Sequence, residues 1–213
     1  MTRVIAGEAR GRRLAVPPGT TTRPTSDRAR EGLFASLLSE LGDLDGKRVL
    51  DLYAGSGAVG LEALSRGANQ VLLVESDARA AAVIRANVAT VGLKGATVAT
   101  DRAERMLARP PADDGPFDLA FADPPYALTE AALNRVLTLL TDGWLVGGAL
   151  VVIERATRSG PLDWPPGYLP VKSRRYGEAT FWYGWYGSDA ESGEQQETVS
   201  RPALDAPHKA HEE

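Results

Sequence analysis

The sequence predicts an α/β protein whose sheet is mostly parallel, and three observations indicate this fold class. From Lys47 onward, short apolar segments alternate with amphipathic segments of helical periodicity. The apolar segments are nearly continuous, as is typical of parallel strands that helices cover on both faces. After residue 167 the pattern changes to two aromatic-rich segments around a Gly177-Glu178 turn, which predicts an antiparallel hairpin at the edge of the sheet.

A β-hairpin is expected at the N-terminus, before the alternating region begins. Segments 3–6 and 14–16 flank a turn region that contains two glycines. Pro17-Pro18-Gly19 then interrupts regular structure. We therefore expect residues 1–24 to form a β-hairpin extension that lies outside the cofactor-binding unit.

The main body, residues 25–187, is expected to begin with a helix. Thr25 or Ser26 can cap this helix, and apolar residues recur every four positions as far as Leu41. The remaining helices and strands follow in alternation. We expect strands at 48–53, 70–75, 96–99, 117–122 and 148–153, helices at 58–66, 78–91, 102–108 and 129–141, and hairpin strands at 168–176 and 180–186.

The last segment, residues 188–213, has the composition of a disordered acidic tail. It contains no aromatic residue, and Val199 and Leu204 are its only large aliphatic residues. Such a segment cannot bury enough apolar surface to offset the entropy that ordering would cost. The tail carries a net charge of −5, whereas residues 1–30 carry +5. The basic N-terminal region is compatible with a polyanionic partner such as a nucleic acid.

The composition excludes several classes of catalytic site. The chain of 213 residues has no cysteine, which rules out thiolate metal sites, iron–sulfur clusters and cysteine nucleophiles. Its two histidines, His208 and His211, both lie in the last six residues, so a histidine base or metal ligand would require the tail to fold back. We expect no metal site. Because the sequence shows neither a signal peptide nor a membrane-spanning apolar run, a cytoplasmic monomer without membrane contacts is expected.

A glycine-rich loop ends the first strand of the main body and begins a helix. Gly55, Gly57 and Gly60 have the spacing GxGxxG, and Glu75 ends the next strand 20 residues after Gly55. A carboxylate at that position can accept hydrogen bonds from both hydroxyls of a ribose. Taken alone, the pattern matches the dinucleotide-binding fingerprint.

Asp51 argues against a dinucleotide. It lies at the carboxyl end of the first strand, four residues before Gly55, where it would repel a pyrophosphate and favour a cationic amino group. S-adenosylmethionine has a ribose and an ammonium group but no phosphate, and it fits better. The alternative is a tight strand–helix turn in which Asp51 is only a cap. The residues expected to bind S-adenosylmethionine are Asp51, Tyr53, Gly55, Gly57 and Glu75.

Two roles are open for Asp101, which follows the third strand of the main body and begins a helix. It could accept a hydrogen bond from the adenine amino group of the cofactor and so belong to the cofactor site. It could equally be an ordinary N-cap.

The fourth strand of the main body runs directly into Asp123-Pro124-Pro125-Tyr126. Because open sheets bind ligands beyond the carboxyl ends of their strands, Asp123 should face the cofactor loop. The prolines leave carbonyls as acceptors, and an ionised Asp123 can only accept hydrogen bonds. Such acceptors can hold both N–H groups of an aryl or amide amine during methylation, and Tyr126 can stack on an extruded base. These four residues are expected to form the methyl-transfer site, although a rigid turn after a strand is the simpler alternative.

Together with further motifs, these residues give the sequence a resemblance to the RsmD family, the bacterial 16S ribosomal RNA guanine(966)-N2 methyltransferases. The resemblance covers residue 3 to about residue 186, and its N-terminal block is the most specific part. It rests on RGRRL at 10–14, RPTSDRAREGLF at 23–34, DLYAGSGAVGLEALSRGA at 51–68 and DPPY at 123–126.

The resemblance implies a Rossmann-like, seven-stranded methyltransferase fold that binds S-adenosylmethionine and methylates a guanine N2 amine in 16S ribosomal RNA. It also implies action on small-subunit particles, in which ribosomal proteins could form part of the docking surface. The N-terminal hairpin would then be an RNA-recognition extension. Its arginines and those of the first helix are expected to contact phosphates, unless they pair with Glu8 or Asp27. They are Arg10, Arg12, Arg13, Arg23, Arg28 and Arg30.

Two other functions stay open on the sequence alone. One is an amino-methyltransferase that acts on adenine or cytosine in DNA, or on a glutamine side chain of a protein. The glutamine enzymes resemble this site but usually carry Asn where Asp123 stands, and their N-terminal domain is helical. The other is a non-catalytic RNA-binding assembly module that keeps the cofactor fold, against which the intact Asp-Pro-Pro-Tyr segment argues.

Overall fold

The structure, a computed structural model, describes residues 2–18, 26–111 and 115–187. The acidic tail at 188–213, the capping candidate Thr25 and the arginine at Arg23 lie outside the described residues. The expectations for them stay predictions.

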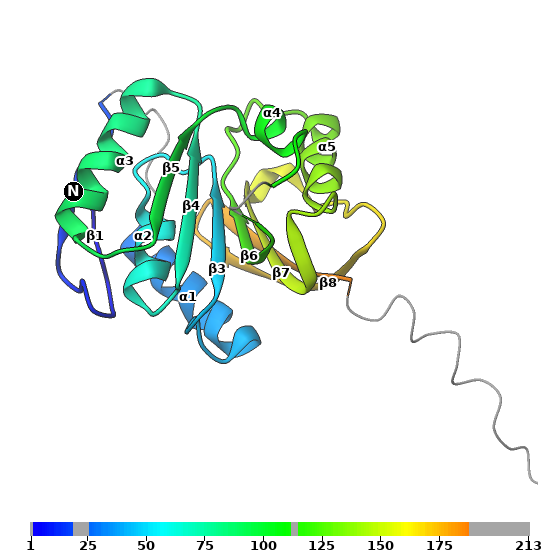
Figure 1. The fold of residues 1–213 in the computed structure, drawn as a ribbon. Coiled ribbons are helices and arrows are strands. Elements are labelled where there is room, and N and C mark those ends of the chain that lie inside the picture. Colours follow the sequence, from blue (N-terminus) through cyan, green and yellow to red (C-terminus); the bar gives the residue numbers. More distant parts are fainter. Residues whose placement is uncertain (1, 19–25, 112–114, 188–213) are drawn as a thin grey trace, which may run out of the picture.

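A seven-stranded sheet forms the centre of the molecule (Figure 1), with the strand order β5-β4-β3-β6-β7-β9-β8. The first five strands in this order pair in parallel, and β9 pairs antiparallel with both β7 and β8. The predicted fold class and the antiparallel C-terminal hairpin are therefore confirmed. The strands of this sheet are β3 (Arg48–Leu52), β4 (Gln70–Glu75), β5 (Ala96–Thr100), β6 (Phe117–Ala122), β7 (Leu145–Ala156), β8 (Tyr168–Tyr176) and β9 (Ala179–Tyr186).

The direction in which strands are added reverses beside β3. From β3 the chain moves outward to β4 and β5, and it returns on the other side of β3 as β6. Asp51 of β3 lies in register with Phe121 of β6, and Leu52 lies in register with Ala122. Because ligands of open sheets bind at such a reversal, the fold places a ligand site beyond the ends of β3 and β6.

Helices cover both faces of the sheet, because the side chains of each strand alternate between two apolar surfaces. One core combines residues of α1, α2 and α3 with strand residues such as Val49 and Phe121. The other combines residues of α4 and α5 with strand residues such as Leu50 and Ala120. Figure 1 shows α4 and α5 together, away from the other helices. The helices are α1 (Asp27–Leu41), α2 (Ala58–Ser65), α3 (Ala78–Val91), α4 (Ala103–Leu107) and α5 (Glu130–Leu140).

Helix α1 begins and ends close to where the sequence predicts. Ser26 is its N-cap, and the Ser26 hydroxyl accepts a hydrogen bond from the backbone N–H of Ala29 at 3.2 Å. Gly42 ends the helix at φ 78°, a left-handed conformation that favours glycine, and its N–H donates to the carbonyl of Leu38.

Several predicted boundaries differ from the structure by one to three residues, and strand β7 and helix α4 are examples. Strand β7 begins at Leu145 rather than at 148, and its pairing with β6 shifts register around the exposed Gly147-Gly148 pair. Glycine gives no apolar signal, so the sequence pattern hides the first part of this strand. Helix α4 is one residue shorter at each end than the predicted 102–108, which is within the usual variation of helix ends.

The N-terminal hairpin is present, but it is shorter than predicted and packs on the body. Its strands are β1 (Thr2–Arg3) and β2 (Arg13–Leu14), which pair antiparallel. Val4 and Ala9, in the connection between them, are only 1% exposed and belong to the core shared with α1 and α2. The hairpin therefore packs on the body that carries the glycine loop and does not stand apart from it.

Polar side chains of α2 and α3 explain this docking. The buried Glu62 carboxylate of α2 accepts hydrogen bonds from two successive backbone N–H groups of the hairpin, at 2.6 and 2.9 Å. Asn87 of α3 accepts from the N–H of Ala15 at 2.8 Å, and it donates to the carbonyl of Ser56 in the glycine loop at 2.8 Å. Asn87 thus joins the end of the hairpin directly to the glycine loop.

Within the described residues, no helix combines the length and the apolar content that crossing a lipid bilayer requires.

Candidate functional site

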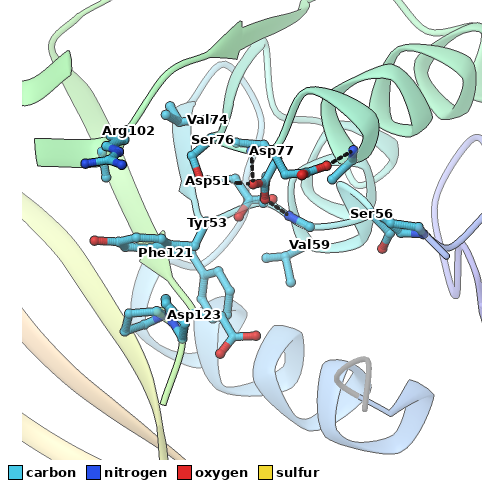
Figure 2. Close-up of a pocket in the computed structure, with 18 of the residues that line it drawn as sticks. Asp51, Tyr53, Ser56, Val59, Val74, Ser76, Asp77, Arg102, Phe121 and Asp123 are labelled. Atoms are coloured by element: carbon cyan, nitrogen blue, oxygen red, sulfur yellow. Dashed lines mark hydrogen bonds between the residues drawn. The ribbon is translucent and has the colours of Figure 1, made fainter. Parts of the chain in front are cut away.

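An open cavity of about 1140 Å³ lies at the carboxyl ends of β3, β4 and β6, where the strand order reverses. Figure 2 shows Ser56 and Val59 on one side of this cavity and Arg102 and Asp123 on the other, with Tyr53 between them. The predicted catalytic and cofactor residues lie around this one cavity, except for Gly57, which is buried beneath the loop. Those that line it are Asp51, Tyr53, Gly55, Glu75, Asp101, Asp123, Pro124, Pro125 and Tyr126.

Glycine is required at each of the three loop positions for a different structural reason. Gly55 (φ 56°) and Gly57 (φ 75°) adopt the left-handed conformation, and Gly57 is the N-cap residue of α2. A Cβ on Gly60 would come within 2.8 Å of Val71 and 3.0 Å of Asp51, so this glycine lets α2 pack directly on the sheet. The loop therefore brings the N-terminus of α2 to the edge of the cavity, where it favours a negatively charged group.

Asp51 is buried at the base of the loop. Its Oδ2 atom accepts a hydrogen bond from the N–H of Gly60 at 2.8 Å, so the capping role that the sequence left open is present. Burial raises the pKa of Asp51 to about 7, and the carboxylate of Glu75 adds to the rise. A cation bound beside Asp51 would offset the cost of ionising it, whereas a phosphate would increase that cost.

Glu75 lies across the mouth of the glycine loop. Its Oε2 atom accepts from the N–H of Gly55 at 2.9 Å, and its Oε1 atom accepts from the N–H of Asp77 at 2.8 Å. Each carboxylate oxygen has a further lone pair, so Glu75 can still accept hydrogen bonds from two hydroxyl groups.

Tyr53 is held in an unusual conformation in the cavity wall. Its φ of 59° is left-handed, which a bulky residue rarely adopts. Its hydroxyl donates to the carboxylate of Glu104 at 3.1 Å. Burial and this carboxylate raise the pKa of Tyr53, so the hydroxyl stays protonated and available as a donor. Backbone strain of this kind is concentrated at ligand-binding sites.

Asp101 lies beside the start of α4 but does not cap it. The N-cap of α4 is Arg102, so the interpretation of Asp101 as an ordinary N-cap is wrong. Its carboxylate instead pairs with Arg105, and with Arg109 at 2.6 Å. Its contact with an adenine amino group stays a prediction, and that amino group would have to share the carboxylate with two guanidinium groups.

The Asp-Pro-Pro-Tyr segment forms the wall beside β6. The backbone N–H of Asp123 donates to the carbonyl of Leu52 at 3.4 Å, which holds the segment next to β3. Burial raises the pKa of Asp123 well above its ordinary value, and the carboxylates of Glu154 and Asp51 raise it further. The ring of Tyr126 is 58% exposed and therefore accessible to a planar ligand.

Sequence reasoning missed residues that line this cavity and an arginine that lies beside it. The buried Glu154 of β7 lines it together with Asp123, and residues 16–18 extend over it from the hairpin. The guanidinium of Arg158 lies 5.9 Å from the centre of the Tyr126 ring. Glu154 is an acid near the end of a predicted strand, but only the pairing of β6 with β7 shows that it lies beside Asp123.

Three of the predicted RNA-binding arginines, Arg10, Arg13 and Arg28, are exposed. Arg12 is exposed as well, but its guanidinium donates to the carbonyls of Thr90 and Val91 at the end of α3. Arg12 therefore contributes to holding the hairpin against the body.

Arg30 differs from the other predicted RNA contacts. It is 1% exposed, and its guanidinium pairs with Asp27 at 3.0 Å and donates to the hydroxyl of Thr2 at 2.8 Å. A buried guanidinium with these partners cannot reach an RNA phosphate, so the prediction for Arg30 is wrong. Pairing with Asp27, the alternative that the sequence left open, is what the structure shows.

The chain is similar in sequence to a described protein family and to several known proteins. The chain matches the family model described as "Conserved hypothetical protein 95" over residues 2–185. It is 38% identical over 167 residues to "Ribosomal RNA small subunit methyltransferase D" of Escherichia coli (strain K12), covering 76% of this chain and 80% of that protein. The protein of the same description from Haemophilus influenzae is 32% identical over 180 residues, covering 84% of this chain and 91% of its own.

A solved structure shows the same fold. The Escherichia coli protein yhhF, a candidate methyltransferase by its description, superimposes with a TM-score of 0.73 at 33% identity. The match covers 87% of this chain and 97% of that one. The family match includes the glycine loop, the Asp-Pro-Pro-Tyr segment and almost the whole C-terminal hairpin.

Proposed function

Because the chain belongs to the RsmD family, which the Conserved hypothetical protein 95 model describes, we propose that it transfers a methyl group from S-adenosylmethionine to the N2 amine of a guanine in 16S ribosomal RNA. The relatives named ribosomal RNA small subunit methyltransferase D support methyl transfer to small-subunit RNA. The choice of a guanine N2 amine rests on the resemblance to the RsmD family, and the chemistry of the site supports an amine on a flat ring.

The observation that carries the proposal is the position of Asp123 on the wall of the cavity that the glycine loop also lines. Asp123 and the carbonyls of the two prolines after it are hydrogen-bond acceptors. The exposed Tyr126 ring beside them can stack on a base. These groups match the needs of an amine with two N–H donors on a flat ring.

The other side of the cavity fits S-adenosylmethionine. Asp51, whose pKa burial raises to about 7, would be stabilised in its ionised form by an ammonium group. Glu75 offers acceptors for ribose hydroxyls, and the N-terminus of α2 favours a carboxylate. The carboxylate of Asp51 at the base of the loop would repel a pyrophosphate, so the fit of a dinucleotide is poorer.

S-adenosylmethionine, when bound, supplies a methyl group on a positively charged sulfur. The chain's own residues then act on the amine, whose lone pair is delocalised into the guanine ring. Asp123 and a proline carbonyl accept its two N–H hydrogens and so favour the pyramidal form with the lone pair toward the cofactor. Transfer of the methyl group to the amine would place positive charge on the nitrogen. Asp123, with its raised pKa, is suited to accept one proton and leave a neutral secondary amine.

Incubation with S-adenosylmethionine labelled in its methyl group tests this function. The acceptor is small ribosomal subunits from a strain that lacks the modification. We expect label in the RNA fraction of these subunits. Label in ribosomal protein would favour the glutamine alternative, and no transfer would favour a non-catalytic assembly module.

Replacing Glu75 with alanine is expected to weaken S-adenosylmethionine binding by about 1.5–3 kcal/mol, the usual cost of losing a charged hydrogen-bond acceptor. This corresponds to a Kd about 10- to 150-fold higher, measurable by calorimetry. Glu75→Gln keeps one acceptor oxygen and should have an intermediate Kd. Unchanged cofactor affinity in Glu75→Ala would remove Glu75 from the cofactor site.

The exposed hairpin arginines are expected to contribute to the salt dependence of RNA binding. Each phosphate contact lowers the log of the binding constant by about 0.7–0.9 per log unit of salt. The double change Arg10→Gln and Arg13→Gln should therefore reduce that slope by about 1–2.

Arg12→Gln is the matched comparison for that double variant. Because Arg12 bonds to the end of α3, its loss should mainly lower the melting temperature. If the double variant has the same slope of log binding constant against log salt concentration as the wild type, the RNA docks on another surface.

A further inference from the structure

Glu154 lies beside Asp123 because of the pairing between β6 and β7. These strands are parallel, and Ala122 is in register with Ile153. Each of these residues is followed by an acid, so Asp123, just past the end of β6, is the neighbour of Glu154 in β7. Side chains alternate along a strand, so both acids point to the face of the sheet that carries Phe121 and Val152, on which Asp51 also lies.

The surroundings of Glu154 are those of a ligand-binding wall. Its side chain is 6% exposed, and it lines the same cavity as Asp123 and Tyr126. Its carboxylate helps to raise the pKa of both of these residues. An ionised carboxylate can accept several hydrogen bonds, so Asp123 and Glu154 can both bond to donors of a ligand in this cavity. The wall is therefore suited to a ligand edge that presents several donors in a row.

We infer that Glu154 determines base specificity by accepting the hydrogen bond of the guanine N1–H group, beside the N2 amine held by Asp123. This inference rests on the proposed function and names the group that selects its substrate. In guanine, the exocyclic amine lies next to a ring N–H donor, so the edge presents three hydrogens in a row. In adenine and cytosine the amine lies next to an unprotonated ring nitrogen, and in a glutamine side chain it lies next to a carbonyl oxygen.

The same geometry explains why the rival substrates are rejected. With adenine, cytosine or glutamine in the cavity, Glu154 would face the lone pair of another acceptor instead of an N–H donor. A site that hydrogen-bonds a polar group of its substrate discriminates strongly against an analogue that lacks this group, by about 10⁴-fold in favourable cases. Asp123 alone cannot make this distinction, because every one of these substrates offers it an N–H donor.

A base analogue tests the inference on the full-length protein. 2-Aminopurine keeps the amine at position 2 of the ring, but its N1 is an acceptor. Small subunits are reconstituted with RNA that carries either guanine or 2-aminopurine at the nucleotide that the wild-type protein methylates. We expect kcat/KM to be at least about 10²-fold lower for 2-aminopurine.

Glu154→Gln is the decisive variant, because its amide can donate to N1 of 2-aminopurine. We expect the preference for guanine to fall to about 10-fold or less, with the melting temperature and S-adenosylmethionine affinity close to those of the wild type. Glu154→Asp keeps the charge and should keep the preference while lowering kcat/KM. Glu178→Gln removes an exposed charge that also acts on Tyr126, and it should leave the preference unchanged.

The outcomes separate the inference from the proposed function. A wild type that methylates guanine N2 but uses 2-aminopurine equally well overturns the role of Glu154 and leaves the proposed function standing. An unchanged guanine preference in Glu154→Gln does the same. A wild type that methylates no guanine overturns both. If Glu154→Gln fails to fold, loss of the guanine preference in Glu154→Asp would also overturn the inference.

Discussion

Replacing Asp123 with alanine is expected to lower the rate of methyl transfer at least about 10²-fold, while the affinity for S-adenosylmethionine stays within a few-fold. The reason is that Asp123 acts on the target amine, both as a hydrogen-bond acceptor and as the group that receives a proton. Single-turnover kinetics with small subunits and equilibrium binding of the cofactor measure the two quantities separately.

Stability provides the control for this variant. The raised pKa of Asp123 shows that its charge is unfavourable in the folded protein, mainly because of burial and then because of Glu154. Asp123→Ala should therefore not lower the melting temperature, so a loss of activity cannot come from unfolding. Retained methyl transfer in a folded Asp123→Ala variant would remove Asp123 from the mechanism.

Asp51 is expected to make the cofactor-free protein less stable as the pH rises. The folded state holds the pKa of Asp51 at about 7, above its ordinary value of 3.8, so the folded state binds a proton more tightly than the unfolded chain. Ionisation of Asp51 in the folded state lowers the free energy of unfolding. This effect is absent below about pH 4, grows as the pH rises, and levels off above about pH 7. A shift of this size corresponds to about 4 kcal/mol at most, at 1.36 kcal/mol for each pH unit.

The comparison that isolates this effect is wild type against Asp51→Asn. The amide oxygen can still accept the hydrogen bond from Gly60, so the cap on α2 is kept. The free energy of unfolding of the wild type, relative to the variant, should fall between about pH 4 and pH 7, as measured by urea titration. A saturating concentration of S-adenosylmethionine should reduce this fall, because a bound cation favours ionised Asp51. A difference that is constant over this range would contradict the account of Asp51.

Local patterns in the sequence predict most of the fold. The apolar strands, the cap at Ser26 and the aromatic hairpin at 168–186 all come from short-range signals, and the structure confirms them. The docking of the N-terminal hairpin could not be predicted in this way. It depends on Glu62 and Asn87, polar residues that become partners of the hairpin only when distant segments meet.

The candidate site shows the same division. Asp51, Glu75 and Asp123 each end a strand, and parallel strands bring their carboxyl ends to one edge, so their convergence on a single cavity was predictable. The burial of Arg30 could not be predicted. An arginine in a basic segment looks the same in the sequence whether its side chain reaches solvent or pairs with a carboxylate such as Asp27. The place of Glu154 beside Asp123 was hidden for another reason. It depends on the register of β6 and β7, and the glycines in β7 obscure where that strand begins.

The identity of the methylated nucleoside tests the proposed methylation of guanine N2 most directly. Small subunits from a strain that lacks the modification are incubated with the protein and labelled S-adenosylmethionine, and their 16S RNA is digested to nucleosides and separated by mass spectrometry. We expect the label in N2-methylguanosine, at one nucleotide. Label in N6-methyladenosine or N4-methylcytidine, or in no nucleoside, would contradict the proposal.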